Sequence, residues 1–146
     1  MRLFTLGFTK KSACEFFTLI NENDIDLLVD VRLNNKSQLA GFTKGDDLRY
    51  FLEKISNCAY EHCEEFAPTK ELLTAYQGKN IDWSKYEVQY KAVMKERGDY
   101  LDFIRRFSKH KRVVLLCSEP DADHCHRRLL AEMLCDLHPE LFVEHI

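Results

Sequence analysis

The chain has 146 residues, of which 45% are hydrophobic and 31% are charged, and its formal net charge is −3. This length suits one domain over residues 1–146, and the hydrophobic fraction excludes a disordered tail. The small net charge gives no general attraction to nucleic acid or to an anionic membrane, and no apolar run approaches the length of a membrane span. We therefore expect one folded domain with neither a nucleic-acid nor a membrane partner.

The N-terminal segment MRLFTLGFTKK and the six cysteines bear on the cellular compartment. Lysines interrupt the apolar part of this segment too early for a secretory signal. None of the cysteines forms a C-x-x-C pair, and a secreted disulfide scaffold would be smaller and richer in Gly and Pro. We expect a cytoplasmic protein with reduced thiols, most of which pack as small hydrophobic side chains.

The first part of the chain predicts a βαβ unit. Residues 2–8 form a short apolar run that favours a strand. Ser12 and Glu15 have the spacing of a capping box and indicate the start of a helix. Residues 25–32, IDLLVDVR, are almost continuously apolar until the charge at their end, as expected for a strand buried on both faces of a parallel sheet.

The middle of the chain predicts a loop, further helices and a third strand. Residues 33–45 read as a polar loop, and the apolar spacing within 48–55 predicts a helix. A third strand is expected over residues 58–63. Residues 66–97 then predict two helices, one ending near Gly78 and one from about Asp82 to Arg97, as a helical insertion or lid.

The last third predicts a helix over residues 100–107, a strand over 112–118, a helix containing Leu129–Leu134 and a closing strand over 141–146. Strands that alternate with helices indicate a three-layer α/β fold, with a mostly parallel sheet of about five strands and helices on both faces. Ligands of such folds bind outside the carboxyl ends of the strands, at the switch point. The strand ends selected by this rule are 7–9, 30–32 and 117–119.

A cluster of thiols, imidazoles and guanidiniums precedes the last expected helix. Asp123 is the expected N-cap, which would place Cys125, His126 and Arg127 in the first turn. Arg127 and Arg128 are then unfavourable there by roughly 0.3–1 kcal/mol each if exposed, because the dipole is positive at this end. A bound anion would favour them, and the same field would lower the pKa of Cys125.

Each of these features also has a structural interpretation. Arg127 can pair with Asp30 or Glu119 and tie two strand ends together. Asp30 and Arg32 can form a structural ion pair at the entrance of a loop, and Cys117 can be a packed residue at the end of an apolar strand. A non-catalytic protein with such an ion-pair network is one alternative to an enzyme.

A metal site is the other alternative. Cys117, His124, Cys125 and His126 are all ligand types, but their spacing is not that of a standard zinc knuckle, and adjacent helical residues diverge. His126 suits core hydrogen bonding as well as it suits a functional role. The glycine pattern matches neither a P-loop nor a dinucleotide fingerprint, so the sequence indicates no cofactor and we assign no metal ligand.

Four segments resemble one known family: TLGFT (5–9), LLVDVR (27–32), APTKELL (67–73) and LLCSEPDADHCHRRLLAE (115–132). They look like the uncharacterised prokaryotic family catalogued as domain of unknown function DUF488. The resemblance implies a small cytosolic α/β domain without an established reaction. The family usually has a histidine at the position of Phe8, so any role of that histidine would be missing here. Carried over by motif, the resemblance implies site residues Gly7, Thr9, Asp30, Arg32, Cys117, Glu119, Cys125, His126 and Arg127.

We therefore expect a site for a small anion or a nucleotide-like ligand at the strand ends. The expected roles are anion binding by Arg32 and Arg127, general base catalysis by Glu119 or Asp30, nucleophilic or redox chemistry by Cys125 with His126 orienting it, and further ligand contacts from Gly7, Thr9 and Cys117. The aromatic residues of 86–94 could cover a pocket or meet a second copy. The sequence specifies neither the substrate nor the oligomeric state.

Overall fold

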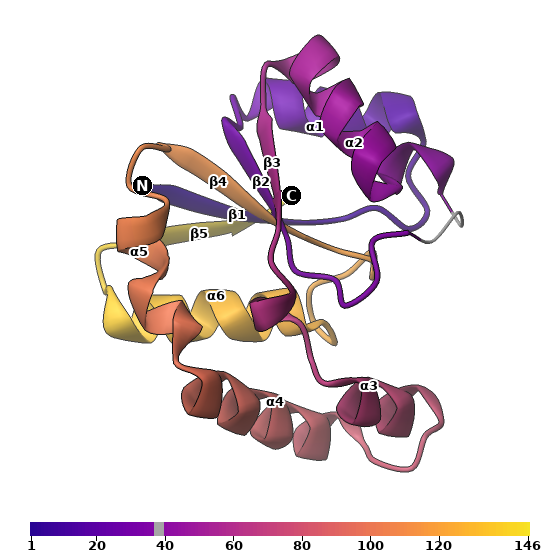
Figure 1. Cartoon of the computed structure of the whole chain (residues 1–146), viewed down its shortest axis with the longest axis vertical. Helices are drawn as coiled ribbons and strands as arrows, with labels where there is room; N and C mark the ends of the chain where they lie inside the picture. Colours follow the sequence, from indigo (N-terminus) through magenta and orange to yellow (C-terminus); the bar gives the residue numbers. More distant parts are fainter. Residues whose placement is uncertain (37–39) are drawn as a thin grey trace.

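A five-stranded parallel sheet forms the centre of the molecule (Figure 1). The computed structural model describes residues 1–36 and 40–146. The strand order is β3-β2-β4-β1-β5, and every described pairing is parallel. The strands are β1 (Arg2–Gly7), β2 (Leu27–Asp30), β3 (Ala59–His62), β4 (Arg112–Cys117) and β5 (Phe142–His145). The expected five-stranded parallel sheet is confirmed.

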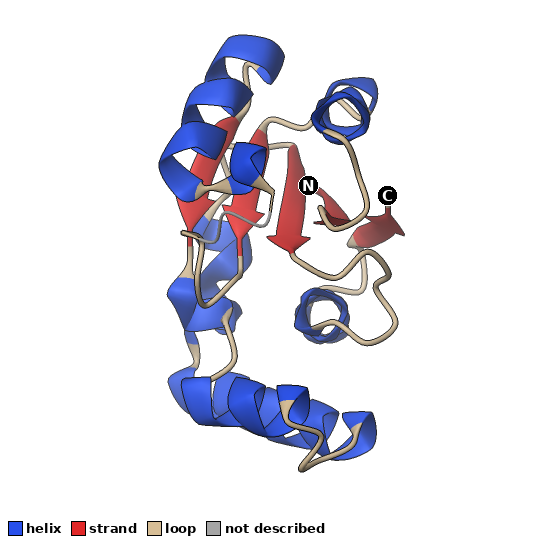
Figure 2. Ribbon diagram, turned by 90° about the vertical axis from the view of Figure 1, so that its right-hand side faces the viewer, coloured by secondary structure: helices blue, strands red, loops and turns tan. Residues whose placement is uncertain are grey.

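Helices cover both faces of the sheet, as expected for a three-layer α/β fold (Figure 2). They are α1 (Ala13–Glu22), α2 (Gly45–Phe51), α3 (Lys70–Gln77), α4 (Trp83–Arg97), α5 (Phe103–Arg106) and α6 (His126–Leu137). A π turn over Leu52–Ser56 extends α2, and 3₁₀ turns lie at Gly41–Thr43, Glu64–Phe66 and Asp99–Asp102. Part of the loop predicted over 33–45, residues 37–39, lies outside the described residues.

Local sequence signals explain several helix boundaries. Ser12 caps α1 by accepting a hydrogen bond from the backbone N–H of Glu15 at 3.1 Å. Asp82 caps α4 in the same way, through the N–H of Lys85 at 2.8 Å. Gly98 ends α4 with φ +78°, a left-handed conformation that glycine adopts without strain.

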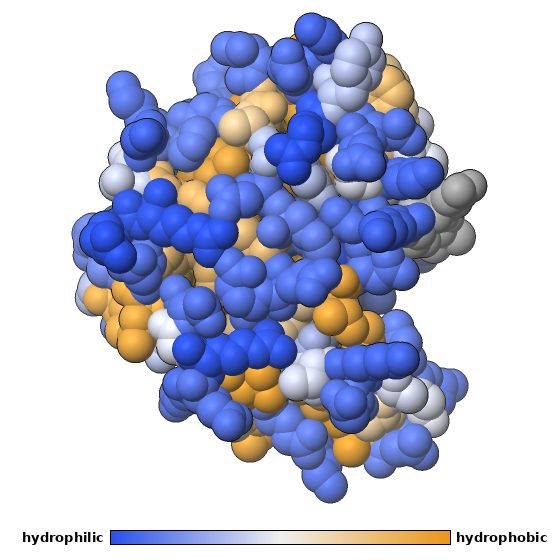
Figure 3. Space-filling view, viewed as in Figure 1, coloured by the Kyte–Doolittle hydropathy of each residue, from blue (hydrophilic) through white to orange (hydrophobic). Residues whose placement is uncertain are grey.

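Two apolar layers flank the sheet because successive strand residues point to opposite faces. One layer joins Phe4, Leu6, Val114 and Leu116 to α1 and α2. The other joins Leu3, Val113 and Leu115 to α4, α5 and α6. The insertion over 66–97 is helical, as predicted, and α3 and α4 lie beyond α6 at the bottom of Figure 1. Figure 3 shows a mostly hydrophilic face whose outline is indented on the right, above these two helices.

The register brings the expected strand ends to one edge of the sheet. Gly7 pairs with Cys117 across β1 and β4, and Asp30 pairs with Leu116 across β2 and β4. The chain leaves β2 toward β3 on one side and leaves β4 toward β5 on the other side, so a switch point lies between β2 and β4. Among the described residues, no helix is long and apolar enough to cross a membrane.

The start of α6 differs from the prediction. The helix begins at His126, and its N-cap is Cys125, with an extended backbone at φ −138° and ψ 138°, so the expected cap at Asp123 is wrong. The preceding loop is held by Arg127, whose Nη1 donates to the carbonyl oxygen of Glu119 at 2.6 Å. The extended Cys125 turns its thiol inward, where the side chain is 2% exposed.

Candidate functional site

A cavity of about 260 Å³ lies at the carboxyl ends of β2 and β4. Its walls come from the segment after β2, the loop after β4, the start of α6, and helices α3 and α4. The lining residues are Arg32, Leu33, Asn34, Pro68, Leu73, Tyr76, Gln77, Trp83, Tyr86, Cys117, Ser118, Glu119, His124, Cys125 and His126. The expected location at the strand ends therefore coincides with a cavity, and the helical insertion supplies one of its walls.

Arg32, which lines this cavity, forms a buried ion pair with Asp30. The Nε and Nη2 atoms of Arg32 donate to the two carboxylate oxygens of Asp30 at 2.8 and 2.6 Å. The hydroxyl of Tyr60 donates to the same carboxylate at 2.7 Å. Asp30 is 0% exposed and Arg32 is 3% exposed. Because its two oxygens are occupied in this way, Asp30 is placed to orient Arg32 rather than to act as a base.

Arg32 retains one free donor. Its Nη2 also donates to the carbonyl of Thr43 at 2.7 Å, and its Cζ lies 5.1 Å from the ring centroid of Phe8. Its Nη1 is buried and has no hydrogen-bond partner among the described residues. Burial lowers the pKa of Arg32, but the hydrogen bond and the charge of Asp30 raise it by more than burial lowers it. The pKa is therefore raised overall, and the guanidinium stays charged. An unpaired buried donor on a cation is costly, and a ligand oxyanion would satisfy it.

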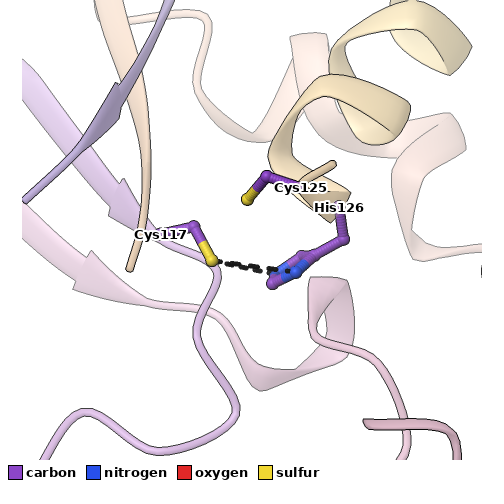
Figure 4. Close-up of side chains that lie close together, drawn as sticks. All are labelled: Cys117, Cys125 and His126. Atoms are coloured by element: carbon purple, nitrogen blue, oxygen red, sulfur yellow. Dashed lines mark hydrogen bonds between the residues drawn. The ribbon is translucent and has the colours of Figure 1, made fainter. Parts of the chain in front are cut away.

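Cys117, Cys125 and His126 converge at the start of α6 (Figure 4). The Cys117 sulfur lies 3.7 Å from Nδ1 and 3.8 Å from Nε2 of His126. Nε2 lies 2.8 Å from the carbonyl oxygen of Val31. A carbonyl only accepts, so this contact places the ring proton on Nε2. The Cys117 sulfur is almost equally far from both ring nitrogens, so it packs against the imidazole and does not lie on the lone pair of Nδ1.

The two thiols are electrostatically unequal. A hydrogen bond from Cys125 lowers the pKa of Cys117, and although burial opposes this, the backbone N–H groups of Ser118 and Glu119 and the charge of Arg127 lower it further. Burial and the neighbouring Cys117 raise the pKa of Cys125 well above its usual value. The predicted lowering at Cys125 is therefore wrong, and the favoured thiolate is Cys117.

The two arginines at the start of α6 have partners of their own. Arg127 is 1% exposed and donates to the carbonyls of Glu119 and Pro120 at 2.6 and 3.3 Å. Arg128 pairs with the Glu132 carboxylate at 2.7 Å. These contacts stabilise both cations, so the helix needs no bound anion to explain them. Arg127 thus binds the backbone carbonyl of Glu119 and does not line the cavity.

Gly7 and Thr9 support the loop after β4 from behind. A Cβ atom at Gly7 would lie 1.7 Å from the Glu119 carbonyl oxygen, so only glycine allows this approach. The N–H of Thr9 donates to the Ser118 carbonyl at 3.1 Å. Of the nine expected site residues, the cavity thus brings together Arg32, Cys117, Glu119, Cys125 and His126, while Gly7, Thr9, Asp30 and Arg127 lie behind its walls.

An aromatic wall lines part of the cavity. We define it as Tyr76, Trp83 and Tyr86, from α3 and α4. The sequence suggested the aromatic residues of 86–94, which include Tyr86, as a possible pocket cover, but it assigned neither Tyr76 nor Trp83 to the site. The available signal was the density of aromatic residues over 76–90, but their spacing equally suits an ordinary helix packed on a core. His124 also lines the cavity, with its ring 5.1 Å from that of Trp83.

Fold and site together define a class: an α/β protein with a parallel sheet, whose cavity at the strand ends holds two thiols, an imidazole and a buried guanidinium. The chain belongs to the family described as Domain of unknown function DUF488, whose model matches residues 12–134. This confirms the resemblance, although the matched span begins after the TLGFT turn. No curated protein and no solved structure matches the chain.

Proposed function

We propose that the chain is a thiol-dependent enzyme that binds a small anionic substrate in the cavity at the strand ends. The observation that carries the proposal is Cys117, a thiol with a lowered pKa that lines a cavity and lies against the His126 imidazole. Structural cysteines in apolar surroundings have a raised pKa, whereas catalytic cysteines have a lowered pKa. Cys58 is an example of a structural cysteine in this chain, because burial raises the pKa of its thiol to about 12.

Each group around Cys117 has a role in this proposal. The thiol proton passes to the His126 imidazole, which lies against the sulfur, and the resulting thiolate attacks an electrophilic atom of the substrate and displaces a leaving group. The N–H groups of Ser118 and Glu119 and the Cys125 thiol stabilise the thiolate before the attack. Nη1 of Arg32 binds the substrate oxyanion, and Asp30 keeps that guanidinium in place.

Alkylation of the native protein with iodoacetamide tests this proposal. Cys117 is expected to react about tenfold faster at pH 7 than exposed Cys14, because more of it is thiolate. Its rate should reach half-maximum below pH 9.0, the ordinary value, since a lowered pKa shifts thiolate formation to lower pH. Peptide mapping by tandem mass spectrometry measures each cysteine separately. Phosphate or a carboxylate should protect Cys117 and leave Cys14 unprotected.

Two variants test whether the Cys125 thiol increases the reactivity of Cys117 by donating a hydrogen bond to it. Cys125→Ser keeps a hydroxyl donor to Cys117 and should preserve most of the fast reaction. Cys125→Ala removes the donor and should slow it. A Cys117 that reacts no faster than buried Cys58 in the native protein would refute the nucleophile.

A transition-metal site is the second candidate function. The three donor atoms of Cys117, Cys125 and His126 lie within 4.8 Å of one another. The imidazole also has the arrangement of a metal ligand, because Nε2 is held by a backbone carbonyl and Nδ1 is free. Two cysteines and one histidine would leave a fourth position open to the cavity, as in catalytic zinc sites.

Titration with Co²⁺ distinguishes the two candidates. A metal site predicts one equivalent bound with thiolate-to-metal absorption, loss of that absorption in Cys125→Ser, and no change in Cys58→Ser, which alters a buried thiol outside the cavity. It also predicts that bound Zn²⁺ protects Cys117 from iodoacetamide. Fast alkylation of Cys117 that Zn²⁺ does not change would exclude the metal site and leave the thiol enzyme.

A further inference from the structure

The three rings of the aromatic wall pack against one another. Trp83 stacks on Tyr86 with ring centroids 5.1 Å apart and an interplanar angle of 23°. Tyr76 lies 4.8 Å from Tyr86 and 5.7 Å from Trp83. Tyr76 and Trp83 are only partly buried, although both pack against the core. His124 and the guanidinium of Arg128 also lie against Trp83, so the ring surface left for a ligand is the exposed part of Tyr76 and Trp83.

The wall and Arg32 lie on different parts of the same cavity. Arg32 comes from the end of β2, whereas the three rings come from α3 and α4. A ligand that fills the cavity can therefore contact both a cation and a π surface. Aromatic faces stack on planar rings, and an aliphatic group of the same volume does not gain this contribution.

We infer that the substrate is a planar aromatic ring bearing one oxyanion, with the ring on the Trp83–Tyr86–Tyr76 wall and the oxyanion on Arg32. This inference rests on the proposed function and names its substrate class. The volume of about 260 Å³ suits a single ring with one anionic group, since it lies below the roughly 300–1,000 Å³ of pockets for drug-sized ligands. An aromatic carboxylate and a nucleotide both combine a planar ring with an oxyanion, which is attached to the ring in the first and carried by the phosphate in the second.

Trp83 provides a direct readout, because it is the single tryptophan of the chain and lines the cavity. Its fluorescence is titrated with two matched pairs of probes. Benzoate is compared with cyclohexanecarboxylate, and uridine 5′-monophosphate with ribose 5-phosphate. The ring-bearing member of at least one pair is expected to change the emission saturably and to bind at least about tenfold more tightly than its ring-free partner. The pair that responds identifies the source of the ring.

Calorimetry on two variants shows whether the wall is responsible. Trp83→Phe keeps an aromatic face and should preserve the preference for the ring. Trp83→Leu removes the face and should reduce the preference to about threefold or less, while the ring-free anion binds as before. If Trp83→Leu still bound the ring-bearing probe as much more tightly than its ring-free partner as the unmodified protein does, the aromatic wall would not be the site that binds the ring.

The same titrations separate this inference from the proposed function. Equal affinity for both members of each pair, with protection of Cys117 from alkylation, would overturn the ring and leave the anion site. Absence of binding by all four probes would overturn the ring, and a slow Cys117 in the same protein would overturn the thiol enzyme as well.

Discussion

Replacing Arg32 with methionine is expected to lower the free energy of unfolding by about 3–5 kcal/mol, because it leaves a buried carboxylate without its partner. Asp30 is 0% exposed and accepts two charge-assisted hydrogen bonds from the Arg32 side chain. Tyr60 would remain as a neutral donor, which does not compensate the charge. Urea denaturation followed by circular dichroism measures the loss.

The chain offers a matched control for this variant. Arg105 and Asp102 form a pair with the same two-bond geometry, at 2.5 and 2.6 Å, but on the surface. Arg105→Met should leave the unfolding midpoint almost unchanged, because solvent screens an exposed pair. The double variant Asp30→Asn with Arg32→Met should recover part of the lost stability, since no buried charge remains. A loss in Arg32→Met no larger than in Arg105→Met would contradict the burial argument.

The sheet was predictable because its signals are local. The run over 27–30 is buried on both faces, as its apolar sequence indicated, and the run over 113–117 is buried in the same way. The Ser12 cap and the helical insertion also follow from short-range patterns. Since the carboxyl ends of parallel strands share one edge, the location of the cavity followed from the fold class.

The chemistry of the site was less predictable because it depends on contacts between distant segments. The pKa is lowered at Cys117 and not at Cys125. The loop after β4 directs backbone N–H groups toward the Cys117 sulfur, and the Cys125 thiol donates a hydrogen bond to that sulfur. Arg127 looked like an anion ligand, but it binds carbonyls seven and eight residues away. No spacing rule indicates that an arginine will bind a loop instead of a ligand.

The start of α6 shows how one residue changes a site. Asp123 has a good capping side chain, yet the helix begins after Cys125, whose thiol gains burial and a contact with Cys117. Tertiary burial outweighed a local preference of about 1 kcal/mol. The shift matters for function, because a Cys125 inside the first turn would not share the backbone conformation that directs its thiol inward.

Gly7→Ala is expected to destabilise the fold by about 3 kcal/mol and to remove the fast reaction of Cys117. The new Cβ atom would meet the carbonyl oxygen of Glu119 at 1.7 Å and its carbonyl carbon at 2.6 Å, both of which are backbone atoms. The loop over 118–120 must then move away from β1. This movement withdraws the Ser118 and Glu119 N–H groups from the Cys117 sulfur and the Glu119 carbonyl from Arg127. Thermal unfolding and the alkylation rate measure the two effects.

Gly41→Ala is the control for adding a methyl group to a glycine, because a Cβ atom there meets nothing within 4 Å and the backbone is not left-handed. It should change stability by less than about 0.5 kcal/mol and leave the alkylation of Cys117 unaltered. The two effects of Gly7→Ala are expected to appear together, since both arise from one displaced loop. A Gly7→Ala protein that loses stability but keeps a fast Cys117 would show that the loop N–H groups do not control the thiolate, and the lowered pKa would then have to come from Cys125 and Arg127 alone.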